Sequence, residues 1–234
     1  MINIYPAASR FSANHGWLKS NFSFSFAEYY DPDNLAFGPL RVFNDDIVAP
    51  QNGFGAHPHK EMEIVSVVLK GQLQHQDSTG NIEVLRPGEI QRMSAGTGIV
   101  HSEENPSTDE EANFLQLWFF PNQQGLAPSY EQKAYDQAAL KNNLLPVVSN
   151  EIAGEQITFI NQDLTLYLSE LDAGRSISFQ QEPGRRIYLF VLDGDLTLNH
   201  EHILNKRDSA RITELTDLEL KTESGAHFML IDLP

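Results

Sequence analysis

Two short pairs of polar residues carry the chemistry that this sequence suggests. The first pair is His57 and His59, in GFGAHPHKEMEIV, and the second is His101 and Glu103, in GTGIVHSEEN. The members of each pair are two positions apart, so on a β-strand they point to the same face. If both segments are strands on neighbouring runs of a barrel, three imidazoles and one carboxylate converge on one point. That is a ligand set for a divalent transition metal, with room left for water or substrate.

The same spacing also occurs where we expect no metal. A lone His-x-His pattern is usually incidental in a soluble protein. His200 and His202 have this spacing, but they follow a DGD turn, and the only histidine after them is His227. We interpret them as part of a solvated turn. We expect His75, in LQHQDS, on a strand or hairpin near the rim of the pocket, and leave open a role in supporting the ligands from behind.

The composition limits the kinds of site that the chain can build. The 234 residues include no cysteine, which excludes disulfides, zinc-thiolate sites, iron–sulfur clusters and thiol nucleophiles. The 16 Lys and Arg against 32 Asp and Glu give a formal net charge of −16, which disfavours direct binding to nucleic acid. The N-terminal sequence lacks the basic and apolar regions of a signal peptide, and no apolar run reaches membrane-spanning length. We therefore expect a cytoplasmic protein with no membrane partner.

Most of the chain carries the pattern of short antiparallel strands. Turn signals recur roughly every 8–12 residues, as in β-sandwiches and barrels. A polar, turn-rich stretch with a short helix expected at 134–142 connects two halves. The second half repeats the order of the first, and it has Arg185 and Arg186 where the first half has its histidine pair. The pattern predicts an all-β chain of two barrel domains: residues 1–134 with the metal site and residues 135–234 without one.

Long stretches of the first half resemble the pirin family of bicupins. The resemblance is carried by HPHKEMEIVSVVLKGQLQHQDSTG, by PGEIQRMSAGTGIVHSEEN and by QLWFFP, and it covers roughly residues 10–130. It implies two antiparallel β-barrel (cupin) domains that face each other, with a divalent metal in the N-terminal one. The family's ligand positions fall on His57, His59, His101 and Glu103, and all four residue types match. Fe(II) is the first choice that the resemblance implies, with Mn, Co, Ni, Cu or Zn as alternatives.

The resemblance also implies an activity. Several bacterial members of the family act as quercetin 2,3-dioxygenases, which open the flavonol ring with O2 and release CO. We expect the flavonol to bind through its 3-hydroxyl oxygen and to lose that proton to Glu103, which makes Glu103 the expected catalytic residue. The family mildly suggests a monomer.

The sequence leaves the identity of the carboxylate ligand open. Cupins in general draw it from the first motif, where Glu63 stands, whereas pirins draw it from the second, at Glu103. We favour Glu103 for its spacing from His101 and expect Glu63 to support the site from behind. An unbroken strand from His57 to Leu69 would place Glu61, Glu63 and the histidine pair on one face.

Two other functions compete with the dioxygenase. Eukaryotic pirins are iron-binding nuclear cofactors of transcription factors, which implies a non-catalytic metal-binding module that acts through a protein partner. A cupin isomerase or decarboxylase would use the metal only as a Lewis acid. We favour the enzyme because Glu103 is present beside an expected pocket and the net charge of −16 gives no sign of a role next to DNA.

Overall fold

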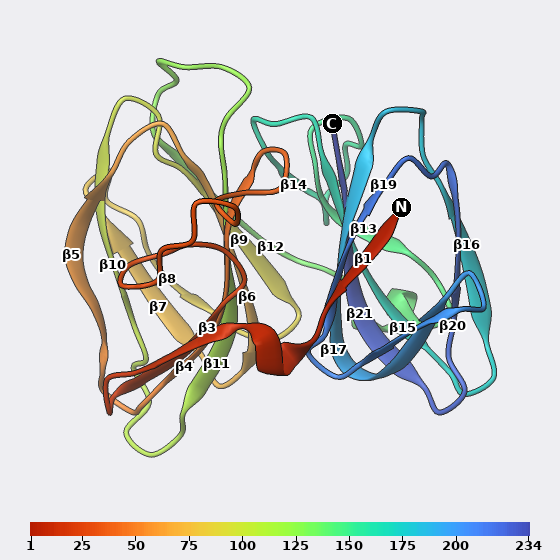
Figure 1. Cartoon of the computed structure of the whole chain (residues 1–234). Helices are drawn as coiled ribbons and strands as arrows, with labels where there is room; N and C mark the ends of the chain where they lie inside the picture. The colour runs from red at the N-terminus through yellow and green to blue at the C-terminus, as the bar shows by residue number, and fades with distance from the viewer. The chain divides into compact units, whose positions relative to one another are not determined.

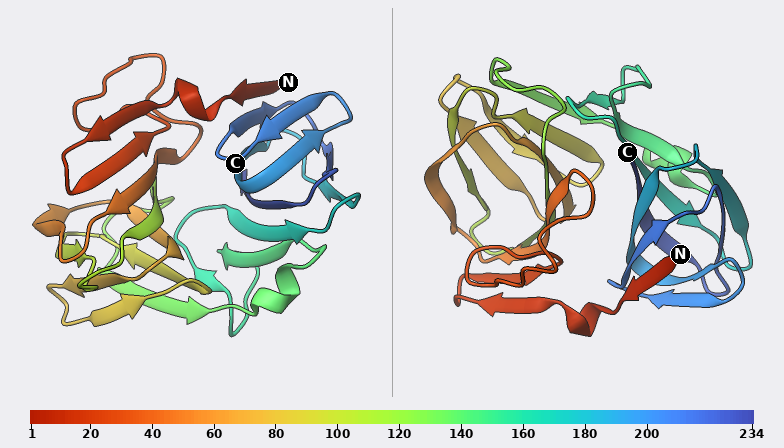
Figure 2. Two further views of the ribbon diagram at one scale, coloured as in Figure 1. Left: turned by 90° about the horizontal axis from the view of Figure 1, so that it is seen from below. Right: turned by 45° about the horizontal axis from the view of Figure 1, so that its top comes forward.

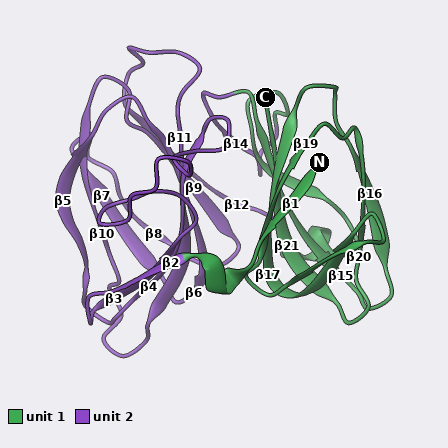
Figure 3. Cartoon of the chain, viewed as in Figure 1, with its two compact units in different colours: residues 1–10, 136–153, 163–234 green, residues 11–135, 154–162 purple.

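The computed structural model describes all residues, 1–234, and almost all of its regular structure is strand. The chain forms two compact units. Unit 2 consists of residues 11–135 and 154–162, and unit 1 consists of residues 1–10, 136–153 and 163–234. Figure 1 labels the strands and Figure 3 colours the two units. The all-β class predicted from the sequence is thus confirmed. The division into domains at residues 134 and 135 stays a prediction.

Unit 2 is built from twelve strands that alternate with tight turns. They are β2 (Phe11–Asn14), β3 (Leu18–Phe22), β4 (Leu40–Val48), β5 (Gly53–His59), β6 (Glu63–Lys70), β7 (Leu73–Asp77), β8 (Ile82–Leu85), β9 (Glu89–Ser94), β10 (Ile99–Glu104), β11 (Ala112–Phe119), β12 (Ser129–Ala134) and β14 (Thr158–Phe159).

Two antiparallel sheets form the body of unit 2. One has the order β5-β10-β7-β8, and the other has the order β12-β9-β6-β11-β4-β3-β2. They lie on opposite sides of a common interior (Figures 1 and 2). An apolar cluster with side chains from both sheets, including Leu73, Leu85, Val68 and Phe114, fills one part of that interior. Burial of this cluster holds the sheets together.

Unit 1 contains the remaining elements. They are β1 (Ile2–Tyr5), a 3-10 helix (Ala7–Ser9), a second 3-10 helix (Gln137–Leu140), β13 (Leu145–Ser149), β15 (Thr165–Leu171), β16 (Ser176–Gln180), β17 (Arg186–Leu198), β18 (His202–Asn205), β19 (Ser209–Thr213), β20 (Asp217–Lys221) and β21 (Ala226–Leu233). The order β1-β19-β17-β21-β15-β13 forms its main sheet, while β20 pairs with both β16 and β17. The N-terminal strand therefore belongs with the C-terminal half of the chain (Figure 1).

The connection between the halves differs from its expected form. In place of a helix over 134–142, only Gln137–Leu140 are helical, in a 3-10 turn whose N-terminus is capped by the Asp136 side chain. Asn142 adopts a left-handed φ of +52°, which is incompatible with continuing a helix. The structure contains no helix with the length and apolar character needed to cross a membrane.

Candidate metal centre

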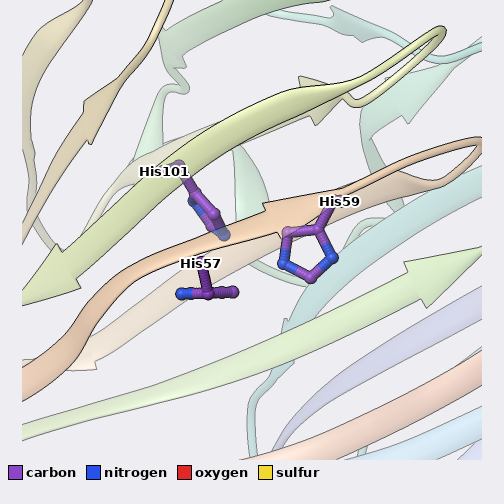
Figure 4. Close-up of side chains that lie close together, drawn as sticks. All are labelled: His57, His59 and His101. Carbon is purple, nitrogen blue, oxygen red and sulfur yellow. The ribbon is translucent and has the colours of Figure 1, made fainter.

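Strands β5 and β10 bring three histidine side chains together. The strands are antiparallel, with His57 opposite His101 and His59 opposite Ile99. Because alternate side chains of a strand share a face, His57 and His59 point the same way as His101. The three ring centroids are 4.5 to 4.9 Å apart. One ligand atom from each ring lies within 4.8 Å of the others, close enough to share one ion (Figure 4).

The ring nitrogens of these histidines are suited to a metal. The Nδ1 of His57 is 2.8 Å from the carbonyl oxygen of Gly55, to which it can donate, and this leaves the Nε2 lone pair available. The Nε2 atoms of His59 and His101 are buried and have no hydrogen-bond partner. Burial, with the nearby charge of His57, lowers the pKa of His59 to about 4 and that of His101 to about 2. Neutral imidazoles with free lone pairs are the form that binds a metal.

Glu103 lies on β10, two residues beyond His101, and is buried. The register with β5 shifts between these two residues, so the strand is locally irregular where it aims the carboxylate. That carboxylate accepts hydrogen bonds from Ser66 on β6 (3.2 Å), from Gln91 on β9 (3.4 Å) and from Gln116 on β11. All three donors belong to the opposite sheet. Burial raises the pKa of Glu103 to about 7 against the opposing effect of these three hydrogen bonds.

The structure separates Glu63 from this cluster. An unbroken strand, the condition for Glu63 to share a face with the histidines, is not found: the chain is interrupted at residues 60–62, where Glu61 has φ of +51°. Glu63 and Ser66 are three positions apart on β6 and point to opposite faces. The Glu63 carboxylate instead accepts hydrogen bonds from Ser94 (2.9 Å) and from the backbone and side chain of Asn161.

His75 lies beside the histidine cluster, and the sequence interpretation left a supporting role for it open. It is fully buried on β7, and its ligand atom lies within 4.8 Å of those of His101 and Glu103. The sequence contains a pattern that points to this residue, because His75 and Asp77 are two positions apart, like His57 and His59 or His101 and Glu103. Gln91 and Gln116, which donate hydrogen bonds to Glu103, lie in no such pattern. By contrast, His200 lies in an exposed turn and pairs with Glu219, as expected for a solvated turn.

An aromatic wall stands beside the histidines. The Trp118 ring lies edge-on to His59 at 4.7 Å, and Phe26 packs edge-on against Trp118 at 5.3 Å. The indole nitrogen of Trp118 is buried and has no partner. The two rings therefore place flat apolar surface and a buried indole N–H close to His59.

Comparisons with known proteins identify the family of this chain. Residues 5–119 match the family model described as Pirin, and residues 147–233 match one described as Quercetinase C-terminal cupin domain. The chain is 40% identical to quercetin 2,3-dioxygenase of Escherichia coli K12 over 100% of its own length and 99% of the relative's. The chain belongs to the pirin family. The predicted bicupin fold class of this pirin is thereby confirmed.

Solved structures agree with this assignment. The crystal structure of YhhW from Escherichia coli has a TM-score of 0.95 and 40% identity, and the match covers 100% of this pirin and 98% of that chain. A structure described as bacterial pirin YhhW in complex with nickel(II) has a TM-score of 0.94 at 39% identity, covering 100% of this pirin and 99% of that chain. A quercetin 2,3-dioxygenase from Acinetobacter baumannii shares the fold at 20% identity, with a TM-score of 0.79 and coverage of 98% and 85%.

Proposed function

We propose that this pirin is a metal-dependent dioxygenase that opens the flavonol ring of quercetin-like substrates with O2 and releases CO. The observation that carries the proposal is the group formed by His57, His59 and His101. The buried carboxylate of Glu103 extends it, with a ligand atom within 4.8 Å of those of His101 and His75. The chain's 40% identity to a quercetin 2,3-dioxygenase over its full length supports the choice of reaction and substrate class.

The proposed ligands are His57, His59, His101 and Glu103, which would hold one divalent cation. The imidazole-rich donor set fits Fe(II), our first choice, and also Mn, Co, Ni, Cu or Zn. The nickel(II) complex of the related pirin supports a single metal of this group. When bound, the metal would supply Lewis-acid stabilisation of a substrate oxyanion, and a redox-active ion such as Fe(II) would also supply electrons for the reaction with O2.

Glu103 is the proposed general base, and it accepts the proton of the flavonol 3-hydroxyl. Its carboxylate is buried, so water does not compete for the proton, and hydrogen bonds from Ser66, Gln91 and Gln116 hold it in place. The aromatic wall of Trp118 and Phe26 would bind the flat face of the substrate beside His59.

The experiment that tests the proposal follows quercetin loss by absorbance together with CO release. The protein is stripped of metal and reloaded with Fe(II) in air, and separately with Mn, Co, Ni or Cu. His57→Ala should lose turnover, whereas His200→Ala, at the exposed histidine that pairs with Glu219, should keep it. Metal uptake without turnover for every metal would contradict the enzyme and favour a non-catalytic metal-binding protein that acts through a partner.

A further inference from the structure

His75 lies directly behind His101. It stands opposite Glu103 in the pairing of β7 with β10, and its side chain is fully buried. Its Nδ1 is 3.4 Å from the Nδ1 of His101, and its ring stacks on Tyr130 at 4.7 Å. The ring is therefore held with one nitrogen facing a proposed metal ligand.

Asp77 fixes the other side of the His75 ring. The Nε2 of His75 is 2.9 Å from Oδ2 of Asp77. The second oxygen, Oδ1, accepts hydrogen bonds from the backbone (2.8 Å) and hydroxyl (2.6 Å) of Thr79 and from the backbone of Asn81 (3.3 Å). Oδ2, which faces the imidazole, also accepts a hydrogen bond from the side-chain amide of Asn81 (2.9 Å). Together these turn contacts fix the orientation of the carboxylate.

The direction of each hydrogen bond follows from the chemistry of the groups. A carboxylate only accepts, so the Nε2 of His75 carries the proton and, in the neutral ring, Nδ1 keeps a lone pair. The Nδ1 of His101 then donates to His75, and the lone pair of His101 lies on Nε2. That Nε2 is the buried nitrogen without a protein partner.

We propose that Asp77 and His75 are positioning residues that set the tautomer of His101, so that its Nε2 lone pair faces the metal. The inference rests on the proposed function, in which His101 is a ligand. The negative charge of the carboxylate also polarises both rings, which makes the Nε2 of His101 a stronger electron-pair donor to the metal. Carboxylates behind metal-binding histidines commonly have this effect. His57 achieves the same tautomer differently, through the backbone carbonyl of Gly55.

Asp77→Asn tests the inference because it keeps the shape of the side chain but replaces one acceptor oxygen by an NH2 group that donates. Three donors from Thr79 and Asn81 hold the remaining oxygen of the new side chain in the Oδ1 position, so its amide NH2 faces His75. The side-chain amide of Asn81, which donates to Oδ2 in the wild type, then turns over and accepts from that NH2. The Nε2 of His75 must then accept, its Nδ1 must donate to His101, and the proton of His101 moves to Nε2. A protonated Nε2 has no lone pair for a metal, so metal binding must first reverse this arrangement, and affinity falls.

Two readouts separate this effect from a loss of folding. The first is the tautomer of His101 in the metal-free protein, measured by nitrogen-15 NMR of the imidazoles, with Nε2 unprotonated in the wild type and protonated in Asp77→Asn. The second is nickel(II) affinity by titration calorimetry, which should fall about 10- to 100-fold. Asp217→Asn makes the same chemical change at an exposed carboxylate on β20 and should keep the wild-type tautomer and affinity.

An unchanged tautomer in Asp77→Asn, or an affinity equal to that of the wild type, would overturn the inference. So would a His75→Gln variant that loses all nickel while Asp77→Asn binds normally, because His75 would then be a ligand itself. If His101→Ala keeps full nickel affinity, the proposed ligand set fails, and the NMR readout of the tautomer still decides the role of Asp77 and His75.

Discussion

His57 and His101 lie directly opposite each other on the antiparallel strands β5 and β10, with ring centroids 4.5 Å apart. Two charged imidazoles at this separation would repel each other across the strand pair. The arrangement instead suits neutral rings that share a cation. The histidine cluster is therefore the first place to test by substitution.

Replacement of His59 by alanine should reduce metal affinity by more than the 10- to 100-fold that loss of an outer partner typically costs, because a proposed ligand atom is removed. Metal content after dialysis against a weak chelator, measured by elemental analysis, checks this outcome. His200→Ala is the matched control and should retain the metal. Equal metal content in His59→Ala and the wild type would remove His59 from the ligand set.

Glu103→Gln should lower turnover of quercetin by about 100- to 10,000-fold, the range that general-base catalysis contributes. The three histidines remain, so appreciable metal should stay bound. Glu104→Gln is the control, because Glu104 is the exposed neighbour on the opposite face of β10. Full turnover in Glu103→Gln would exclude Glu103 as the base.

Gly53→Ala should destabilise the protein by about 1–3 kcal/mol and weaken metal binding, because overpacking forces a backbone to move. A Cβ at Gly53 would overlap the carbonyl oxygen of Glu103 and press β5 away from β10, the two strands that carry the histidines. Gly55→Ala is the control on the same strand, since a Cβ there meets nothing within 4 Å. Urea denaturation and metal titration measure both effects, and equal behaviour of the two variants would contradict the expected overlap.

Asp46→Asn should change how stability depends on pH. Burial, reinforced by the charges of Asp45 and Glu103 and opposed by a hydrogen bond from Ser20, raises the pKa of Asp46 to about 7 from 3.8. A raised pKa means that the folded state binds the proton more tightly than the unfolded state does. This stabilisation is therefore complete below about pH 4, and it is lost as the pH rises through about 7.

An asparagine at position 46 cannot ionise, so the variant should gain stability relative to the wild type as the pH rises from about 4 to about 7. Above that range the difference between the two proteins should level off. Urea denaturation of both proteins at a series of pH values gives the difference in their free energies of unfolding. The titration of groups that both proteins share cancels in this difference. A difference that stays constant with pH would show that Asp46 does not hold its proton in the folded state.

Residue spacing along the chain is enough to predict the parts of the site that depend on local geometry. Alternation along a strand makes residues two apart share a face, so the pairing of His57 with His59 and the all-β class could be predicted from spacing and turns. The pirin motifs extended this to the family, because their length makes a chance match improbable.

Features that depend on contacts between distant strands became visible in the fold and could not be predicted from spacing. The placement of β10 between β5 and β7 brings His75 and Asp77 behind His101, and the opposite sheet supplies Gln91 and Gln116 to Glu103. The break between β5 and β6 at residues 60–62 separates Glu63 from the histidine cluster. The N-terminal strand β1 pairs with β19, near the other end of the chain. Strand order and register are set by non-local burial and pairing, which the alternation within a single strand does not encode.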